Sequence, residues 1–358
     1  MGLISVGIRH FRNLSAVDFE PSPEVNVVFG RNASGKTSLL EAVYFLGRAR
    51  SFRTHRVDRL VQNGADQLQV FGRLSAEAGT VPLGVERSRQ ETRIRIGGQA
   101  VSAVSALAAA LPVQLVHPNS HRLLEEGPQY RRRFLDWGVF HVEPAFFPAW
   151  QRYQRALRQR NAALRKDQPS RSVSAWNQEL VEAAAVIDSA RRRYVERLGP
   201  QMAAFTERLA EIEGVALKYR GGWPEAVQFG VALEEAARRD RDARHTTVGP
   251  HRADVRVNVG DVAAAGRVSR GQQKLLVAAL LLAQAMLFNE STGQRSLILV
   301  DDLAAELDAD HRRRFMGLLK GLPAQSFVTA IDAESLSADD IGPARVFHVE
   351  HGQLREMV

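Results

Sequence analysis

Residues 25–46 read VNVVFGRNASGKTSLLEAVYFL. The first five residues are a β-rich run, residues 30–37 fit the pattern G-x-x-x-x-G-K-T, and an amphipathic segment follows from Ser38 to Leu46. A strand, a glycine-rich loop and a helix in this order form the context in which that pattern cradles phosphates. The glycines let successive N–H groups face one anion, and the helix N-terminus adds partial positive charge. We therefore predict a nucleotide site here.

Within this loop, Lys36 is expected to reach the β- and γ-phosphates, and the Thr37 hydroxyl to ligate magnesium. The alternative is a glycine-rich turn that happens to end in Lys-Thr. The residues predicted to contact the nucleotide are Gly30, Arg31, Asn32, Ala33, Ser34, Gly35, Lys36, Thr37 and Ser38.

A pair of carboxylates follows a second apolar run. Residues 297–300 read LILV and lead directly into Asp301 and Asp302. Four consecutive apolar residues indicate a strand buried on both faces, and carboxylates at its carboxyl end lie where phosphate loops also lie. We expect Asp301 to hold magnesium and Asp302 to orient or deprotonate the attacking water. The alternative is a charged pair where a strand meets solvent.

A third motif, VSRGQQK at residues 268–274, precedes an apolar helix that starts at Leu275. A hydroxyl, a glycine and a helix N-terminus together can bind an anion. A simple helix cap by Ser269 is the alternative. With this motif the chain resembles the heads of ABC-type ATPases: an α/β fold with a mixed β-sheet and helices.

That resemblance implies a homodimer with ATP sandwiched between the subunits. The signature residues that would act on the partner's nucleotide are Ser269, Arg270, Gly271 and Gln272. Asp308 matches the dimer-facing D-loop, and Thr329 stands where the switch histidine usually is. Asp302 replaces the usual glutamate and reaches less far, so the resemblance predicts slow hydrolysis by Lys36, Asp301 and Asp302.

The middle third of the chain differs from its flanks. Apolar residues recur at steps of three and four from residue 145 to 198, which predicts an antiparallel helical hairpin with a turn at residues 166–171. The β/α alternation returns after it. We expect an ATPase head from residues 1–112 and 242–358, with a mostly helical second lobe at 113–241 inserted into it, and a closing edge strand at 346–349.

Positive charge is concentrated in this helical lobe. The chain has 48 Lys and Arg against 40 acidic residues, a net charge of +8. Between residues 131 and 200 there are 14 basic and seven acidic residues, including the run Arg152 to Arg160. We predict contact with nucleic acid, an ordinary solvated helix face being the alternative. The residues assigned to DNA are Arg131, Arg132, Arg133, Arg191, Arg192 and Arg193.

Composition narrows the class of protein. There is no cysteine, which excludes thiol chemistry and disulfides. The longest apolar run, residues 275–288, is too short to span a bilayer and predicts a buried helix. We see no signal peptide and no histidine ligand spacing typical of a metal site. We expect a cytoplasmic protein without membrane contact.

Four further stretches narrow the resemblance: IRHFRNL at 8–14, SFR at 51–53, YRRRFLD at 130–136 and TVGPHRAD at 247–254. With the phosphate loop at 30–37 (Walker A), the strand and carboxylates at 297–302 (Walker B) and the signature motif, the chain resembles the RecF family of bacterial recombination and gap-repair ATPases, related to the Rad50 and SMC heads. The resemblance implies ATP- and magnesium-dependent dimerisation on double-stranded DNA at gaps and weak, DNA-stimulated ATP hydrolysis. It also implies a RecR partner and support of RecA loading, DNA replication and the SOS response.

Three rival functions differ in what they require. A transporter subunit needs a surface that couples to a membrane domain, and a nuclease needs a further metal-carboxylate cluster. A clamp that binds ATP with little or no turnover has the same motifs as the ATPase.

Overall fold

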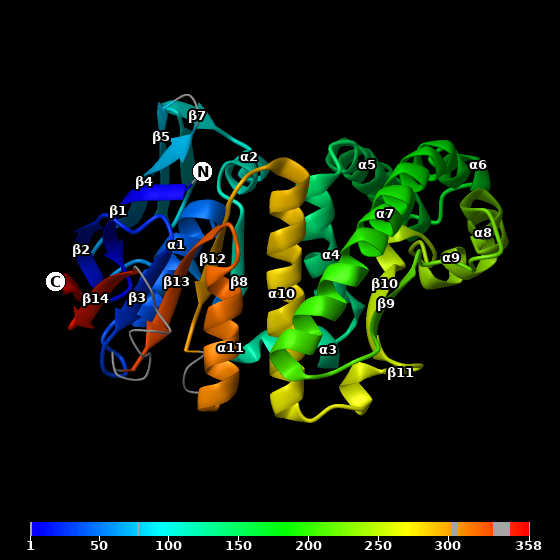
Figure 1. Cartoon of the computed structure of the whole chain (residues 1–358). Coiled ribbons are helices and arrows are strands. Elements are labelled where there is room, and N and C mark those ends of the chain that lie inside the picture. Colours follow the sequence, from blue (N-terminus) through cyan, green and yellow to red (C-terminus); the bar gives the residue numbers. More distant parts are fainter. Residues whose placement is uncertain (1, 77–78, 303–306, 332–343, 358) are drawn as a thin grey trace. The chain divides into compact units, whose positions relative to one another are not determined.

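A computed structural model of the chain describes residues 2–76, 79–302, 307–331 and 344–357 (Figure 1). Its contacts divide the chain into two compact units. The first unit contains residues 1–120, 208–210 and 274–358, and the second contains residues 121–207 and 211–273.

The first unit is built mainly from strands. Its strands are β1 (Gly2–Phe11), β2 (Leu14–Phe19), β3 (Val25–Phe29), β4 (Gln67–Ala76), β5 (Gly79–Ser88), β6 (Thr92–Ile96), β7 (Gln99–Val101), β8 (Val113–Val116), β12 (Ser296–Val300), β13 (Ala324–Ala330), β14 (Ala344–Glu350) and β15 (Gln353–Met357). Its helices are α1 (Lys36–Arg48), α2 (Val104–Ala110), α11 (Ala309–Lys320) and most of α10 (Arg270–Thr292).

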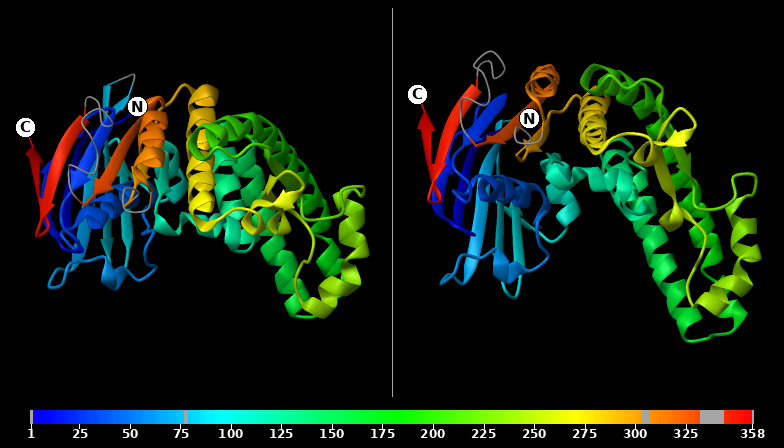
Figure 2. Two further views of the ribbon diagram at one scale, coloured as in Figure 1. Left: turned by 60° about the horizontal axis from the view of Figure 1, so that its bottom comes forward. Right: turned by 90° about the horizontal axis from the view of Figure 1, so that it is seen from below.

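One six-stranded sheet of this unit has the order β15-β14-β3-β13-β12-β8. The four pairings from β14 to β8 are all parallel, and only the edge strand β15 is antiparallel to its neighbour. All residues of β12 and β13 are buried, which explains the unbroken apolar run before the carboxylates. The first and last thirds of the chain share this sheet, as the red C-terminal strands beside blue N-terminal ones in Figure 2 show.

The expected closing edge strand was wrong in its position. Residues 346–349 lie inside β14, which pairs with β3 on one side and with β15 on the other. The His351–Gly352 turn, with both residues at positive φ, reverses the chain and adds β15 as the edge.

The other six-stranded sheet, β2-β1-β4-β5-β6-β7, is antiparallel throughout. The strand β4 alternates between buried and exposed residues, as its sequence predicts for a sheet with one covered face. Helix α1 supplies much of the core against it, because Leu39, Leu40, Val43 and Leu46 are all fully buried. Each such leucine or valine contributes about 1.5–3 kcal/mol to burial, so α1 is held firmly behind the phosphate loop.

The second unit is mostly helical. Its helices are α3 (Arg122–Glu125), α4 (Pro128–Val142), α5 (Phe146–Arg165), α6 (Ser170–Ser174), α7 (Asn177–Ala210 apart from its last three residues), α8 (Phe229–Glu235) and α9 (Ala237–Ala243). Its strands β9 (Val215–Arg220), β10 (Asp254–Val259) and β11 (Val262–Ala263) form a small antiparallel sheet in the order β11-β10-β9.

The predicted hairpin corresponds to α5 and α7, with α6 inserted in the expected turn. Helix α7 runs past the expected end at residue 198 and continues through Pro200. The buried side chains of Met202 and Leu209 extend the apolar face beyond the proline, so packing holds the helix together where the backbone loses a donor.

The unit boundaries differ from the expected ones at both junctions. Strand β8, expected in the helical lobe, pairs with β12 in the first unit. Residues 254–259, expected in the head, form β10 and pair with β9 across six residue positions in the second unit. The sequence near residue 242 has no feature that reveals this long-range pairing.

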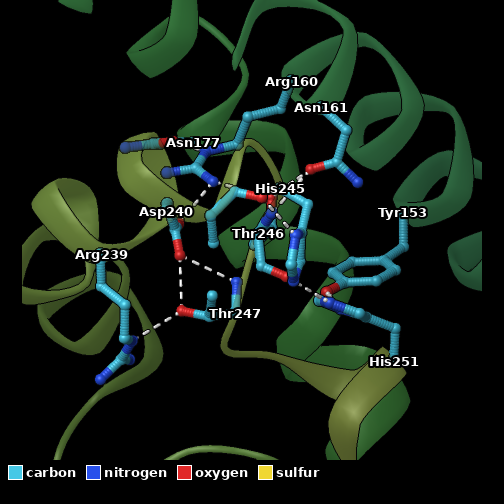
Figure 3. Close-up of polar contacts among 11 residues, drawn as sticks. Tyr153, Arg160, Asn161, Asn177, Arg239, Asp240, His245, Thr246, Thr247 and His251 are labelled. Carbon is cyan, nitrogen blue, oxygen red and sulfur yellow. Dashed lines mark hydrogen bonds and ion pairs between the residues drawn. The ribbon is translucent and has the colours of Figure 1, made fainter. Parts of the chain in front are cut away.

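A buried polar network fixes the motif at residues 246–251 within the second unit (Figure 3). Arg160, 1% exposed, donates to the Asp240 carboxylate and to the Thr246 hydroxyl, both at 2.7 Å. The His251 ring lies between the Tyr153 hydroxyl at 2.7 Å from Nδ1 and the Thr246 carbonyl at 3.0 Å from Nε2. Because a carbonyl only accepts, Nε2 carries a proton. Burial lowers the pKa of His251 to about 4, so near neutral pH Nδ1 is unprotonated and accepts from the Tyr153 hydroxyl. The ring is therefore held as a neutral tautomer.

Helix α10 has 23 residues, nine more than its apolar run. It is the one described helix that is long and apolar enough to cross a membrane, and 67% of its most apolar window is buried within the protein. This burial is that of a core helix.

Candidate nucleotide-binding site

The phosphate loop connects β3 to α1 as predicted. Gly30 and Gly35 have φ of 155° and 124°, and a Cβ added at Gly30 would lie 2.3 Å from the Val349 carbonyl oxygen. Only glycine therefore fits at the start of the loop. The N-terminus of α1 has no side-chain cap, so its first amide groups remain available to a ligand.

The loop has the features of an anion-binding site. Ser34 Oγ is buried and has no hydrogen-bond partner among the described residues. Lys36 is 8% exposed, and its Nζ folds back onto the carbonyls of Gly30 at 2.5 Å and Arg31 at 3.1 Å. Burial lowers the pKa of Lys36, and the charges of Asp302 and Asp301 oppose that shift. A triphosphate would give Lys36 and Ser34 charged partners, so these residues fit ATP.

Two turns outside the motif hold the loop in shape. The Ser34 carbonyl accepts from the Asn13 side chain at 3.2 Å and from the Gly352 amide at 2.9 Å. Asn13 lies in the β1–β2 turn and Gly352 in the β14–β15 turn. Gly352 has φ of 76°, and a Cβ there would lie 2.1 Å from the Asn13 carbonyl oxygen. Both ends of the first unit's chain therefore support the phosphate loop.

The carboxylates at the end of β12 join this loop. Asp301 Oδ1 accepts from Thr37 Oγ1 at 3.0 Å and from Thr329 Oγ1 at 3.1 Å. Burial raises the pKa of Asp301, and the hydrogen bonds from Thr37 and Thr329 work against that shift. A hydroxyl and a carboxylate side by side are hard oxygen donors that would suit magnesium.

Thr329 also contacts the second carboxylate residue. Its Oγ1 accepts from the Asp302 amide at 2.8 Å. Asp302 has φ of 55°, in the left-handed region, which is strained for a residue with a side chain. The fully buried Thr329 thus links Asp301 and Asp302 at the position predicted for the switch residue.

Sequence reasoning missed a buried carboxylate on α1. Glu41 is fully buried and accepts from Arg12 through both oxygens, at 2.5 and 2.7 Å, and from the Ser51 hydroxyl. Arg53 lies 3.5 Å from the same carboxylate, and its charge acts to lower the pKa of Asp301 against the larger effect of burial. A glutamate on an otherwise apolar helix face was the available signal.

The signature segment begins α10 with an exposed N-terminus. Ser269 Oγ accepts from the Gln272 amide at 3.3 Å, and the Gln272 side chain accepts from the Ser269 amide at 3.0 Å. This reciprocal pair is a capping box, so the helix cap that was the alternative interpretation is present within the chain. Ser269, Arg270, Gly271 and Gln272 are all exposed, and a Cβ at Gly271 would meet only the Ser269 hydroxyl at 4.0 Å.

The predicted D-loop lies partly outside the described residues, which omit 303–306. Asp308 begins α11 as its N-cap and accepts from the His311 amide at 2.9 Å. The backbone and ring of His311 lower the pKa of Asp308.

The six arginines assigned to DNA are mostly engaged within the second unit. Arg191 is fully buried, pairs with Asp136 at 2.8 Å and lies over the rings of Phe146 and Trp150. The DNA prediction is therefore wrong for Arg191. Burial between aromatic rings costs a delocalised guanidinium less free energy of desolvation than burial elsewhere in a protein core. The sequence run Arg191 to Arg193 does not reveal which of its side chains turns inward.

The other five arginines of the two runs also contact residues of the second unit, some of them half-buried and some exposed. Arg131 is 13% exposed and pairs with Asp254 at 2.7 Å, and Arg132 donates to the Ala253 carbonyl at 2.7 Å. Arg192 pairs with Asp188 and Arg193 with Glu143, both on the surface. Exposed Arg133 lies over the Tyr130 ring. The runs mainly hold the unit together.

The chain is similar to known proteins over nearly its whole length. The family model described as the RecF/RecN/SMC N terminal domain matches residues 3–354. Proteins named DNA replication and repair protein RecF from Pseudomonas fluorescens (strain Pf0-1) and Pseudomonas putida (strain GB-1) are each 45% identical over 99% of this chain and 98% of their own length.

Solved structures show the same fold. A structure of the recombination mediator protein RecF-ATP in the RecFOR pathway superposes with a TM-score of 0.89 at 23% identity, covering 100% of this chain and 98% of that one. An Smc head bound to the C-winged helix domain of ScpA superposes with a TM-score of 0.59 at 13% identity, covering 100% and 98%. The predicted ABC-type ATPase head fold is therefore confirmed. With a matching family model over nearly its whole length and relatives of this similarity, the chain belongs to the RecF family of DNA replication and repair proteins.

Proposed function

We propose that this chain is an ATP-dependent DNA-binding protein of recombinational gap repair. ATP and magnesium join two copies on double-stranded DNA, and slow, DNA-stimulated hydrolysis releases them. The observation that carries the proposal is the Thr37–Asp301–Thr329 linkage, which connects the phosphate loop, the magnesium-binding carboxylate and the strained Asp302 backbone.

Each side chain has a role that follows from its position. Lys36 leaves the Gly30 and Arg31 carbonyls for the β- and γ-phosphates, and Ser34 supplies its unpartnered hydroxyl. Thr37 and Asp301 would hold magnesium, which would neutralise charge on the phosphate oxygens. Asp302 orients or deprotonates the attacking water, and Thr329 keeps the Asp302 backbone in place.

The partner copy supplies the second half of the site. The exposed α10 N-terminus offers Ser269 and Gly271 to a phosphate that lies outside its own chain. Asp308 faces the same dimer interface in this proposal. RecR as a partner, support of RecA loading and SOS induction, and a cytoplasmic location come from the family resemblance.

The test is the ATP-dependent size of the protein with duplex DNA. Sedimentation should show dimers with ATP, magnesium and DNA, and monomers with a Lys36→Ala variant. Ser269→Arg should stay monomeric while its nucleotide affinity remains that of the wild type, because the bulk is added on the surface outside the phosphate loop. Wild-type protein that remains monomeric at saturating ATP and DNA would refute the proposal.

A clamp with little or no turnover is the second candidate. Asp302 is one methylene shorter than glutamate, so its carboxylate reaches less far toward a water. Phosphate release with and without duplex DNA distinguishes the two functions, since a clamp would bind DNA with ATP and release no phosphate in either condition.

A further inference from the structure

The exposed face of α5 and the turn after it carry an unusual excess of positive charge. Between residues 144 and 178 the chain has seven Arg and Lys and a single acidic residue, Asp167. Helix α5 itself contains five arginines and no acidic residue.

Some of this charge is neutralised by neighbouring elements. Buried Arg160 pairs with Asp240, and Arg152 pairs with Glu179 and Glu182 on α7. Asp167 is in turn paired with Arg241 at 3.1 Å. The cations that remain are exposed and form no ion pair in the part of the chain that the structure describes. We call this group the basic stripe: Arg155, Arg158, Arg165, Lys166 and Arg171.

Helical geometry places the stripe on one side of α5. Arg155, Arg158 and Arg165 follow a spacing of three and seven, so they share a face and span about 15 Å along the axis. Tyr153 and Leu157 are buried on the other face. Three parallel positive side chains repel one another unless an anion lies over them.

The tertiary structure extends the stripe beyond the helix. Val173 of α6 packs with Ala163 and Leu164 of α5, which brings Arg171 beside the end of α5. Arg241 of α9 donates to the Gln168 carbonyl at 3.2 Å and to Ser170 Oγ at 2.9 Å, so the turn that carries Lys166 is fixed.

The chemistry of the stripe fits a phosphate backbone. Between residues 144 and 178, all of which the structure describes, no large apolar side chain is exposed. This surface therefore offers no anchor for a protein interface or for insertion into lipid. Arginine forks match phosphate oxygens, and duplex DNA carries one charge per about 1.7 Å of its axis, enough to meet several cations over the length of the stripe.

We propose that the basic stripe binds the sugar–phosphate backbone of duplex DNA. This inference rests on the proposed DNA-binding function, and it moves the contact surface from the mostly engaged runs 131–133 and 191–193 to α5 and α6. Contact with phosphates alone carries no base specificity, so the stripe would bind duplex of any sequence.

The test compares two triple variants that each remove three positive charges. Arg158→Ala, Arg165→Ala and Arg171→Ala removes most of the stripe. The matched control, Arg73→Ala, Arg89→Ala and Arg95→Ala, removes three exposed arginines of the first unit that form no ion pair among the described residues. Arg73 lies on β4, Arg89 in the β5–β6 turn and Arg95 on β6. Affinity for a random-sequence duplex is measured by fluorescence anisotropy with ATP from 50 to 200 mM salt, and thermal unfolding confirms that both variants are folded.

The stripe variant should show a slope of log K against log salt that is shallower by about 2–3, because each lost phosphate contact removes about 0.9 from the slope. Its affinity at 0.1 M salt should fall roughly 100-fold by the same relation, and the control should keep the wild-type slope. If wild type binds duplex and the stripe variant keeps both slope and affinity, this inference is overturned and the proposed function stands. Wild type that binds no duplex with ATP would overturn both.

Discussion

Replacing Thr329 by valine tests whether this side chain positions Asp302, the carboxylate proposed to act on the attacking water. Valine has the same shape but no hydroxyl, so the fully buried position stays filled. The variant loses the acceptor for the Asp302 amide at 2.8 Å and the donor to Asp301 at 3.1 Å. Nothing is removed from Lys36 or from the phosphate loop.

The size of the effect follows from the orphaned amide. A buried donor without a partner costs about 1–3 kcal/mol. Asp302 already holds a left-handed backbone at φ of 55°, so part of this cost is avoided when the residue relaxes away from its position. We therefore expect hydrolysis to fall roughly 5- to 150-fold, the rate equivalent of 1–3 kcal/mol, while unfolding free energy falls by less than about 3 kcal/mol.

Single-turnover phosphate release measures the chemical step, and a fluorescent ATP analogue measures binding. Thr37 still donates to Asp301 at 3.0 Å, so nucleotide affinity should change by less than threefold or so. Thr329→Ser keeps the hydroxyl and should restore most of the rate. A folded Thr329→Val protein that hydrolyses ATP at the wild-type rate would show that this hydroxyl has no positioning role.

Three further predictions concern other parts of the chain. Lys36→Arg keeps the charge but changes its reach, so ATP binding should persist and turnover fall; normal hydrolysis in that variant would contradict the role given to Lys36. Arg191→Ala leaves the Asp136 carboxylate without its buried partner and should destabilise the protein by about 3–5 kcal/mol in denaturant unfolding. The surface variant Arg193→Ala should cost about 1 kcal/mol or less. Equal effects of the two substitutions would contradict the difference in burial. Burial lowers the pKa of His251 to about 4, so on acidification the unfolded chain binds a proton at this residue before the folded protein does. The free energy of unfolding should therefore fall by up to about 3 kcal/mol from pH 6.5 to pH 4. His251→Gln should flatten that part of the stability profile, and a profile that the substitution leaves unchanged would show that the ring is not held neutral.

The local motifs of the site could be predicted because short stretches of chain determine them. The run VNVVFGRNASGKT requires a strand, a tight turn and a helix N-terminus within 13 residues, and the apolar run LILV places Asp301 and Asp302 at the end of a buried strand. Helical periodicity likewise predicted the hairpin of α5 and α7.

The contacts between these motifs needed the tertiary structure, because they join residues far apart in the chain. Thr37 and Asp301 are 264 positions apart, and Asn13 and Gly352 meet at one carbonyl of the phosphate loop. Pairing of β10 with β9 decided the unit boundary, and packing decided that Arg191 is buried while Arg158 remains in solvent. Composition gives the number of charges in a helix, whereas only packing and ion pairing decide which charges remain available to a partner.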